Sequence, residues 1–449
     1  MKISNRKIEY IFLGLSLFLS ACQNPKSKAV NESGIIFNNE EKLTQQIIYD
    51  VFTPPVASRV YAYSSLASYE AIHFQDSTYP SISEKLHGFG LEPRPEKGKK
   101  YNFTLSATKA FFFMVRKLTF SLDSLNSYEN AVYNQYKSNL DDSTYRRSID
   151  FGDKIGAYIF SRSKTDNYLK SRGKPKYIGS ENPGKWRPTP PDYLDGVEWC
   201  WGTMKTFVLD SSSQFSLPSP PPYSEDTSSE YFRQNKVVFE KSLHLSKDEI
   251  EIARFWDDNP FVMQHSGHMM FANKKITPGG HWIGITTIAC KKAKFNPVRT
   301  AWAYALTSVA LFDAFVNSWQ IKYKTDYIRP VTVINDKIDP EWQTLLQTPP
   351  FPEYPSGHST ITRAASVVLT RIFGDHFDFQ DTSNLRYIGI KRHFTSFIQA
   401  SDETSISRFY GGIHYLNSVN QGAALGQKIG DLFVHRLIDK REENKVKVQ

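Results

Sequence analysis

Apolar and small residues recur every three or four positions along most of this chain, which is the spacing of one helix face. In residues 418–437 this spacing includes Gly422, Gly426 and Gly430, a stripe that lets two helices approach closely. The alternation expected of half-buried strands is hardly seen. The sequence therefore predicts an all-α fold of packed helical bundles. The predicted helices begin at about residue 41 and include residues 60–72, 106–120, 128–140, 145–163, 230–243, 247–256, 297–322, 359–373 and 418–437.

Two proline-rich segments interrupt this pattern at residues 182–191 and 217–223, and they bound a region with few regular elements. The chain has 449 residues, of which 40% are hydrophobic and 14% aromatic, enough to bury a large core. Its mean hydropathy is −0.45, and beyond the N-terminus no apolar run approaches the roughly 20 residues of a membrane span. These values exclude a polytopic membrane protein.

The first 22 residues have the organisation of an export signal. Basic residues precede an apolar stretch at residues 11–19, and the segment ends in Leu-Ser-Ala-Cys at Cys22. This ending resembles a bacterial lipobox, so residues 1–22 are predicted to be a lipoprotein signal peptide and Cys22 the lipidated residue that anchors the protein to a membrane. An ordinary secretory signal is the alternative. The absence of Asp at the second position after Cys22 favours the outer membrane, on its periplasmic or its outer face.

Residues 23–40 are polar and are predicted to tether this anchor to a helical domain over residues 41–440. The formal charge of +9 is spread along the chain, so no nucleic-acid partner is expected. Three cysteines make no disulfide framework, and the sequence leaves Cys200 and Cys290 either free or paired.

Short segments in the second half carry residues suited to binding an oxyanion. Lys322 and Arg329 lie seven residues apart, which is two helical turns, so both can point to one side. Ser356, Gly357 and His358 open a predicted helix, where free N–H groups and the helix dipole favour an anion. His358 would lie beside such an anion as a proton donor.

A third segment contains Arg408, whose guanidinium suits an oxyanion, and His414, which follows after paired glycines that permit a tight turn. Each segment alone is also compatible with a structural role. Together, Lys-x6-Arg-Pro, Pro-Ser-Gly-His and Ser-Arg-x5-His resemble the tripartite signature of the acid phosphatase and vanadium-dependent haloperoxidase superfamily.

The resemblance is closest to the vanadium-dependent haloperoxidases, and among them to the bacterial iodoperoxidases. Trp319 and Phe351 look like the aromatic residues of their vanadate pocket. Further similar segments are residues 255–256, 278–282 and 312–314. The resemblance implies helical bundles like those of vanadium chloroperoxidase, with a superfamily core at about residues 298–437, and vanadate as the cofactor.

Carried over residue by residue, the resemblance implies that His414 binds vanadium through Nε2 and that His358 is the acid–base group. The residues implied to hold the vanadate oxygens are Lys322, Arg329, Ser356, Gly357 and Arg408. Trp319 and Phe351 are expected to line the substrate pocket. In this family vanadate acts as a Lewis acid that activates hydrogen peroxide for attack by a halide, which leaves as hypohalous acid. The implied partners are therefore hydrogen peroxide and a halide.

One position departs from the superfamily pattern. An acidic residue often lies four positions after the ligand histidine, and here that position is Ser418. Because a hydroxyl carries no charge, we expect a weaker partner for His414. This departure disfavours phosphatase activity, which needs a good histidine nucleophile.

The leading hypothesis is vanadate-dependent oxidation of iodide, with bromide as a second candidate halide. Phe351 lies where bromoperoxidases of this group tend to have a histidine, which favours iodide. One alternative is a non-specific acid phosphatase with His414 as the phosphohistidine nucleophile. Another is a lipoprotein that binds oxyanions without turnover. Assays of iodide oxidation with vanadate and of phosphate-ester hydrolysis distinguish these three functions.

Overall fold

The computed structural model describes residues 30–260, 263–266, 269–272 and 275–439, and within them the chain is predominantly helical. The helices of the first half are α2 (Glu32–Tyr49), α3 (Pro54–Ile72), α4 (Phe103–Leu118), α5 (Asp123–Lys137), α6 (Asp142–Ser163), α7 (Tyr168–Arg172), α8 (Glu230–Ser242) and α9 (Lys247–Phe255). Those of the second half are α10 (Pro278–Lys292), α11 (Pro297–Thr325), α12 (Pro330–Lys337), α13 (Gly357–Phe373), α14 (Leu385–Ile388), α15 (Phe397–Tyr410) and α16 (Leu416–Phe433).

Two antiparallel strand pairs supply the strands of the described part of the chain. Strand β1 (Met263–Ser266) pairs with β2 (Met269–Ala272), and β3 (Phe379–Asp381) pairs with β4 (Arg392–Phe394). The prediction of an all-α fold is confirmed. All the predicted helices are present with shifted ends, whereas α7, α10, α12, α14 and α15 were not predicted. Helix α10 is largely buried and opens with Pro278-Gly279-Gly280, so it lacks both a polar face and the composition of a strong helix.

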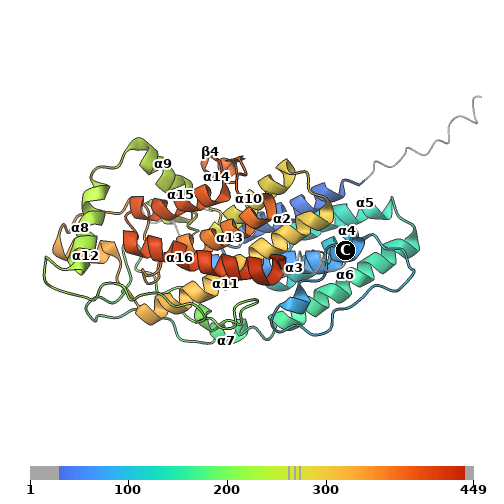
Figure 1. The fold of residues 1–449 in the computed structure, drawn as a ribbon, viewed down its shortest axis with the longest axis horizontal. Helices are drawn as coiled ribbons and strands as arrows, with labels where there is room; N and C mark the ends of the chain where they lie inside the picture. Colours follow the sequence, from blue (N-terminus) through green and yellow to red (C-terminus); the bar gives the residue numbers. More distant parts are fainter. Residues whose placement is uncertain (1–29, 261–262, 267–268, 273–274, 440–449) are drawn as a thin grey trace, which may run out of the picture.

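The helices form an elongated molecule, with α4, α5 and α6 at one end and α8 and α12 at the other (Figure 1). Between them, α11 packs against α3 and α13, and α13 also packs against α15 and α16. Within the described residues, none of the helices combines the length and the apolar character that crossing a membrane requires. Cys200 and Cys290 are both free and buried.

The helical domain begins earlier than predicted. Asn31 caps α2 by accepting a hydrogen bond from Gly34 N, and the helix then buries Ile35, Ile36 and Phe37. The prediction of a tether over residues 23–40 is therefore wrong for residues 32–40, because these apolar residues pack into the fold. The signal peptide, Cys22 and residues 23–29 lie outside the described part of the chain.

The glycine stripe of α16 lies against α13, as its spacing predicted. A Cβ atom at Gly422 would lie 2.6 Å from Ser356 O, and one at Gly430 would lie 2.6 Å from Val367 Cβ. At Gly426 a Cβ atom would collide with the backbone carbonyl of Thr360. This close approach places the start of α16 beside the first turn of α13.

Candidate active site

The three motif segments meet where α11 ends, α13 begins and α15 turns into α16. Lys322 lies in the last turn of α11, but that helix ends at Thr325, and Asp326 follows with a left-handed φ of 52°. Arg329 is then the N-cap of α12. The expectation that two turns of one helix align Lys322 and Arg329 is therefore wrong. Although α11 ends between them, both cations lie beside the Phe351 ring.

The second segment opens α13 as predicted. Ser356 is the N-cap, and its Oγ accepts a hydrogen bond from Ser359 N at 3.3 Å. Gly357 is the first helical residue, and a Cβ atom there would lie 3.1 Å from Trp319 Cζ3 and 3.6 Å from Lys322 Cε. The N-terminus of α13 therefore lies directly against the Trp319 and Lys322 side chains of α11.

The third segment reaches the site through a tight turn, also as predicted. Arg408 is in the last turn of α15, and Gly412 has a left-handed φ of 75°, a conformation that favours glycine. His414 follows just before α16. Arg408 and His414 are both buried together with the residues of the other two segments.

Lys322 fastens the loop in front of α13. Its Nζ donates to the carbonyl oxygens of Pro352 (3.0 Å), Glu353 (2.9 Å) and Pro355. All three ammonium hydrogens therefore have backbone acceptors in this structure. Burial lowers the pKa of Lys322 well below its usual value, and the neighbouring charge of Arg329 lowers it further.

The two arginines differ in how many of their donors are occupied. Arg329 donates through Nε to Phe351 O (3.0 Å) and through Nη1 to Ile413 O (2.8 Å), and Nη1 also lies 3.2 Å from His414 Nε2. Arg408 donates through Nη1 to Trp256 O at 2.8 Å. Its Nε and Nη2 atoms are buried without a hydrogen-bond partner. Burial lowers the pKa of both guanidinium groups to about 10.

His414 has an acidic partner that the sequence analysis missed. Its Nδ1 lies 2.7 Å from Glu353 Oε1, and the same oxygen accepts a hydrogen bond from Tyr415 N at 3.1 Å. Ser418 Oγ donates to Glu353 Oε2 at 2.5 Å. The expectation of a weaker partner is therefore wrong, because Glu353 supplies the charge that Ser418 lacks and Ser418 orients it.

These hydrogen bonds determine which nitrogen of His414 carries the proton. Nδ1 of His414 donates to Glu353, which leaves the Nε2 lone pair facing Arg329. Burial raises the pKa of Glu353, and Arg329, Ser418 and Lys322 act against that rise. Hydrogen bonds from Tyr415 N and Ser418 Oγ stabilise its ionised form, but burial outweighs them and the net effect raises the pKa of Glu353 to about 7. The signal in the sequence was a single acidic residue three positions before Ser356 in a proline-rich loop.

His358 lies in the first turn of α13 and keeps part of its ring exposed. Its Nε2 atom is nevertheless buried and has no hydrogen-bond partner. Burial lowers the pKa of His358 well below its usual value, and the charge of Arg408 adds to this effect. A lowered pKa favours the neutral imidazole, whose unpartnered Nε2 faces the site.

Trp319 and Phe351 form an apolar wall beside the cations. Their ring centroids are 5.0 Å apart. Lys322 Nζ lies 5.2 Å from the Phe351 ring centroid, and Arg329 Cζ lies 5.1 Å from it. The phenyl ring thus contacts both cations in a region closed to water.

These residues fit an oxyanion such as vanadate. Three buried cations converge on the site, and Arg408 and His358 aim buried nitrogens that have no partner. Such atoms are costly to bury unless a ligand satisfies them. Ser356 Oγ also accepts from Ser359 Oγ at 2.7 Å, which leaves its own hydrogen to donate to a ligand. His414 Nε2 is the candidate metal ligand.

A family model described as the second helical-bundle domain of VCPO matches residues 303–442. The crystal structure of the first bacterial vanadium-dependent iodoperoxidase superposes with a TM-score of 0.86 and 39% identity, over 92% of this chain and 98% of that one. The chain belongs to the vanadium-dependent haloperoxidase family. The holo form of a bacterial vanadium-dependent chloroperoxidase shares the fold, with a TM-score of 0.65 and 18% identity over 88% of this chain and 95% of that one.

The vanadium chloroperoxidase of Curvularia inaequalis is 25% identical over 27% of this haloperoxidase and 29% of its own length. The matched part thus spans less than a third of that fungal enzyme. The family implies vanadate as the cofactor, with hydrogen peroxide and a halide as substrates.

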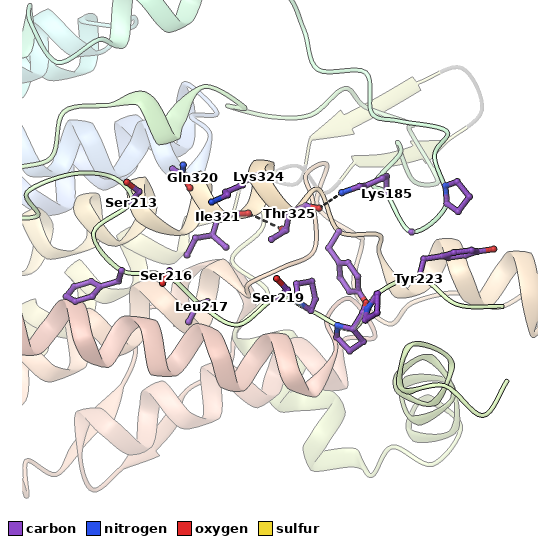
Figure 2. A pocket seen from close by; sticks show the side chains of 17 residues that line it. Lys185, Ser213, Ser216, Leu217, Ser219, Tyr223, Gln320, Ile321, Lys324 and Thr325 are labelled. Carbon is purple, nitrogen blue, oxygen red and sulfur yellow. Dashed lines mark hydrogen bonds between the residues drawn. The ribbon is translucent and has the colours of Figure 1, made fainter. Parts of the chain in front are cut away.

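A pocket of about 430 Å³ lies beside the end of α11 (Figure 2). The proline-rich segment at residues 217–222 and the end of α11 line it, the latter through Gln320, Ile321 and Lys324. Trp319 and Lys322 are not among its lining residues.

Proposed function

We propose that this haloperoxidase oxidises iodide with hydrogen peroxide, and that His414 is its vanadium ligand. The observation that carries the proposal is the meeting of three buried cations with the Nε2 atom of His414, whose other nitrogen is held by Glu353. The likeness at 39% identity to a protein described as an iodoperoxidase supports iodide as the halide.

The hydrogen bonds of each side chain indicate its role in the site. Bound vanadate supplies a Lewis acid that makes peroxide electrophilic. Arg408 binds the oxyanion through Nε and Nη2, and Gly357 N and Ser356 Oγ bind it at the helix N-terminus. Glu353 keeps the proton of His414 on Nδ1, which leaves Nε2 unprotonated as the ligand atom. His358 Nε2 accepts a proton from peroxide and returns it to the leaving oxygen.

The wall formed by Trp319 and Phe351 supports iodide over the smaller halides. Both rings are buried and offer no hydrogen bond from the face that contacts the cations. A halide beside them loses water without a replacement donor, which penalises small, strongly hydrated chloride most. Iodide, which is large and weakly hydrated, loses least.

Reconstitution of the purified protein tests this proposal. Protein stripped with a chelator should lose iodide oxidation and regain it with orthovanadate, and phosphate should compete. His414→Ala should abolish vanadium retention, whereas His358→Ala should retain vanadium and lower kcat by about 10²–10⁴-fold. Recovery with iron or haem instead, or equal vanadium content in His414→Ala and wild type, would refute the proposal.

A phosphatase is the second candidate, and the contact between His414 and Glu353 favours it. A carboxylate on Nδ1 raises the nucleophilicity of Nε2, which is what formation of a phosphohistidine requires. Hydrolysis of a phosphate ester by vanadate-free protein, lost in His414→Ala, would establish this second activity.

We also propose that Cys22 is lipidated and anchors the enzyme to the outer membrane. The support is the Leu-Ser-Ala-Cys sequence after a short apolar stretch. Cys22→Ser should move the protein from the membrane fraction to the soluble fraction of the bacterium that makes it. An unchanged distribution would exclude an anchor at this residue.

A further inference from the structure

Residues 256–258 form a short turn after α9 that contacts two active-site groups. Arg408 Nη1 donates to the carbonyl oxygens of Trp256 (2.8 Å) and Asp257 (3.3 Å). The Asp257 backbone also lies near His358, where it acts against the lowering of the pKa of His358. The position of this turn therefore determines where the unpartnered Nε and Nη2 atoms of Arg408 point.

A buried triad of charged side chains holds this turn from the other side. Asp258 Oδ2 lies 2.8 Å from His281 Nδ1, and His281 Nε2 lies 2.9 Å from Asp381 Oδ2. All three residues are buried. Because each ring nitrogen faces a carboxylate, His281 donates from both and is an imidazolium. Burial lowers the pKa of His281, but Asp258 and Asp381 outweigh this and raise it to about 10.

Further contacts connect the triad to the ends of the turn. Asn384 Nδ2 donates to Phe255 O (2.8 Å) and to Asp258 Oδ1 (3.0 Å). The ring of Trp256 stacks on His281 at 4.5 Å with an interplanar angle of 22°. Asp258 itself has a left-handed φ of 42°, a backbone conformation that needs such support.

Trp256 also ties the turn to the helix that carries Arg408. Its Nε1 atom donates to Glu403 Oε1 at 2.9 Å, and Glu403 lies on α15 five residues before Arg408. The turn is thus fixed by the triad on one side and by α15 on the other. Movement of the turn would move the acceptors of Arg408 Nη1.

We propose that the Asp258–His281–Asp381 triad positions the oxyanion site by holding the turn at residues 256–258 against Arg408 and His358. His281 is a positioning residue, because it acts through the turn. Removal of its charge leaves two buried carboxylates facing each other, and their repulsion displaces the turn. The inference rests on the proposed function, since it assumes that Arg408 binds the oxyanion.

Calorimetric titration of vanadate-free protein with orthovanadate tests this inference. His281→Gln removes the charge and one donor, and we expect the Kd for vanadate to rise by about 10–100-fold, the range seen when partners of metal-binding groups are lost. A melting curve of the same vanadate-free protein measures the accompanying loss of stability.

His73→Gln is the matched control. His73 is also buried against two glutamates, with Nε2 at 2.9 Å from Glu92 Oε1 and 4.0 Å from Glu70 Oε2, but it follows α3 among the N-terminal helices. The His73→Gln variant should have a lower melting temperature and an unchanged Kd for vanadate. A similar melting loss in His281→Gln with a wild-type Kd would show that the triad is only structural, and would overturn the inference.

Asp381→Asn is a second variant that tests the inference if His281→Gln does not fold. It keeps the shape of the triad and one acceptor for His281. A smaller but measurable rise in the Kd is expected, and a wild-type Kd in this variant would also overturn the inference. Failure of the wild-type protein to bind vanadate would instead refute the proposed function, so the two failures are distinguishable.

Discussion

At the scale of single residues, Glu353 decides how His414 can bind a metal. The carboxylate accepts from His414 Nδ1 and from Ser418 Oγ, so it fixes both the tautomer and the direction of the ring. In metal sites such partners raise the basicity of the ligand histidine. The hydroxyl of Ser418 therefore orients the carboxylate of Glu353 and does not itself contact His414 as the acidic partner.

We predict that Glu353→Gln raises the Kd for vanadate by about 10–100-fold. The amide keeps the size of the side chain but loses the charge, and its NH₂ group can compete for the same hydrogen bonds. Ser418→Ala, the control, removes one hydrogen bond and should have a smaller effect. Calorimetric titration with orthovanadate measures both variants, and an unchanged Kd in Glu353→Gln would contradict the role of the carboxylate.

Substitution of Phe351 is expected to change the preference of the enzyme for one halide over another. Phe351→His adds a donor that can stabilise bromide or protonate bound peroxide. We predict a rise in the bromide-to-iodide ratio of kcat/KM by about 5–30-fold, the scale of one added hydrogen bond. Steady-state kinetics with both halides checks this. An unchanged ratio with vanadate fully bound would remove Phe351 from the argument on selectivity.

At the scale of elements, the contact between α13 and α16 sets the geometry of the site. Gly426 has no room for a Cβ atom against Thr360 O, and the same two helices carry Ser356 and Ser418, whose backbones are joined by a hydrogen bond of 3.1 Å. A displacement of α16 therefore reaches the residues that orient Glu353.

We predict that Gly426→Ala lowers the free energy of unfolding by about 1–3 kcal/mol, because an added methyl forces the two backbones apart. Gly173→Ala is the control, since that position has negative φ and open space around the added Cβ. Its effect should stay within about 0.5 kcal/mol. Chemical denaturation of both variants measures the difference, and equal stabilities would show that α16 adjusts without cost.

At the scale of the whole molecule, buried acids make stability depend on pH. Burial raises the pKa of Glu40 to about 8, and it does the same for Glu70. Each group keeps its proton in the folded state above the pH at which the unfolded chain releases it, near 4.5. Their stabilising contribution is thus complete below pH 4.5 and is lost as pH rises to about 8.

We predict that Glu40→Gln reduces the fall in unfolding free energy between pH 5 and pH 8. One such group contributes a slope of up to about 1.4 kcal/mol per pH unit. Glu41→Gln is the control, because Glu41 is the exposed neighbour on the same helix. Denaturation curves at several pH values measure the slopes, and equal slopes in wild type and Glu40→Gln would show that Glu40 is ionised in the folded protein.

The helices and the three motif segments could be predicted from the sequence because they depend on local patterns. Apolar spacing specifies a helix face. Ser356 caps the helix that begins at the residue immediately after it, and Gly412 adopts the left-handed conformation that its turn requires. Even the stripe of glycines in α16 indicated a close helix contact before its partner was known. Local spacing was misleading where α11 ends at Asp326 between Lys322 and Arg329, and it did not indicate α10, α12 or α15.

Contacts between distant segments were decided only by the tertiary structure. Glu353 and His414 are 61 residues apart, and His281 and Asp381 are 100 apart. No periodicity connects such pairs, because an acidic side chain in a loop has many possible partners until packing selects one. The sequence determined which residues could bind an oxyanion, and burial in the folded chain decided which carboxylates hold them in place.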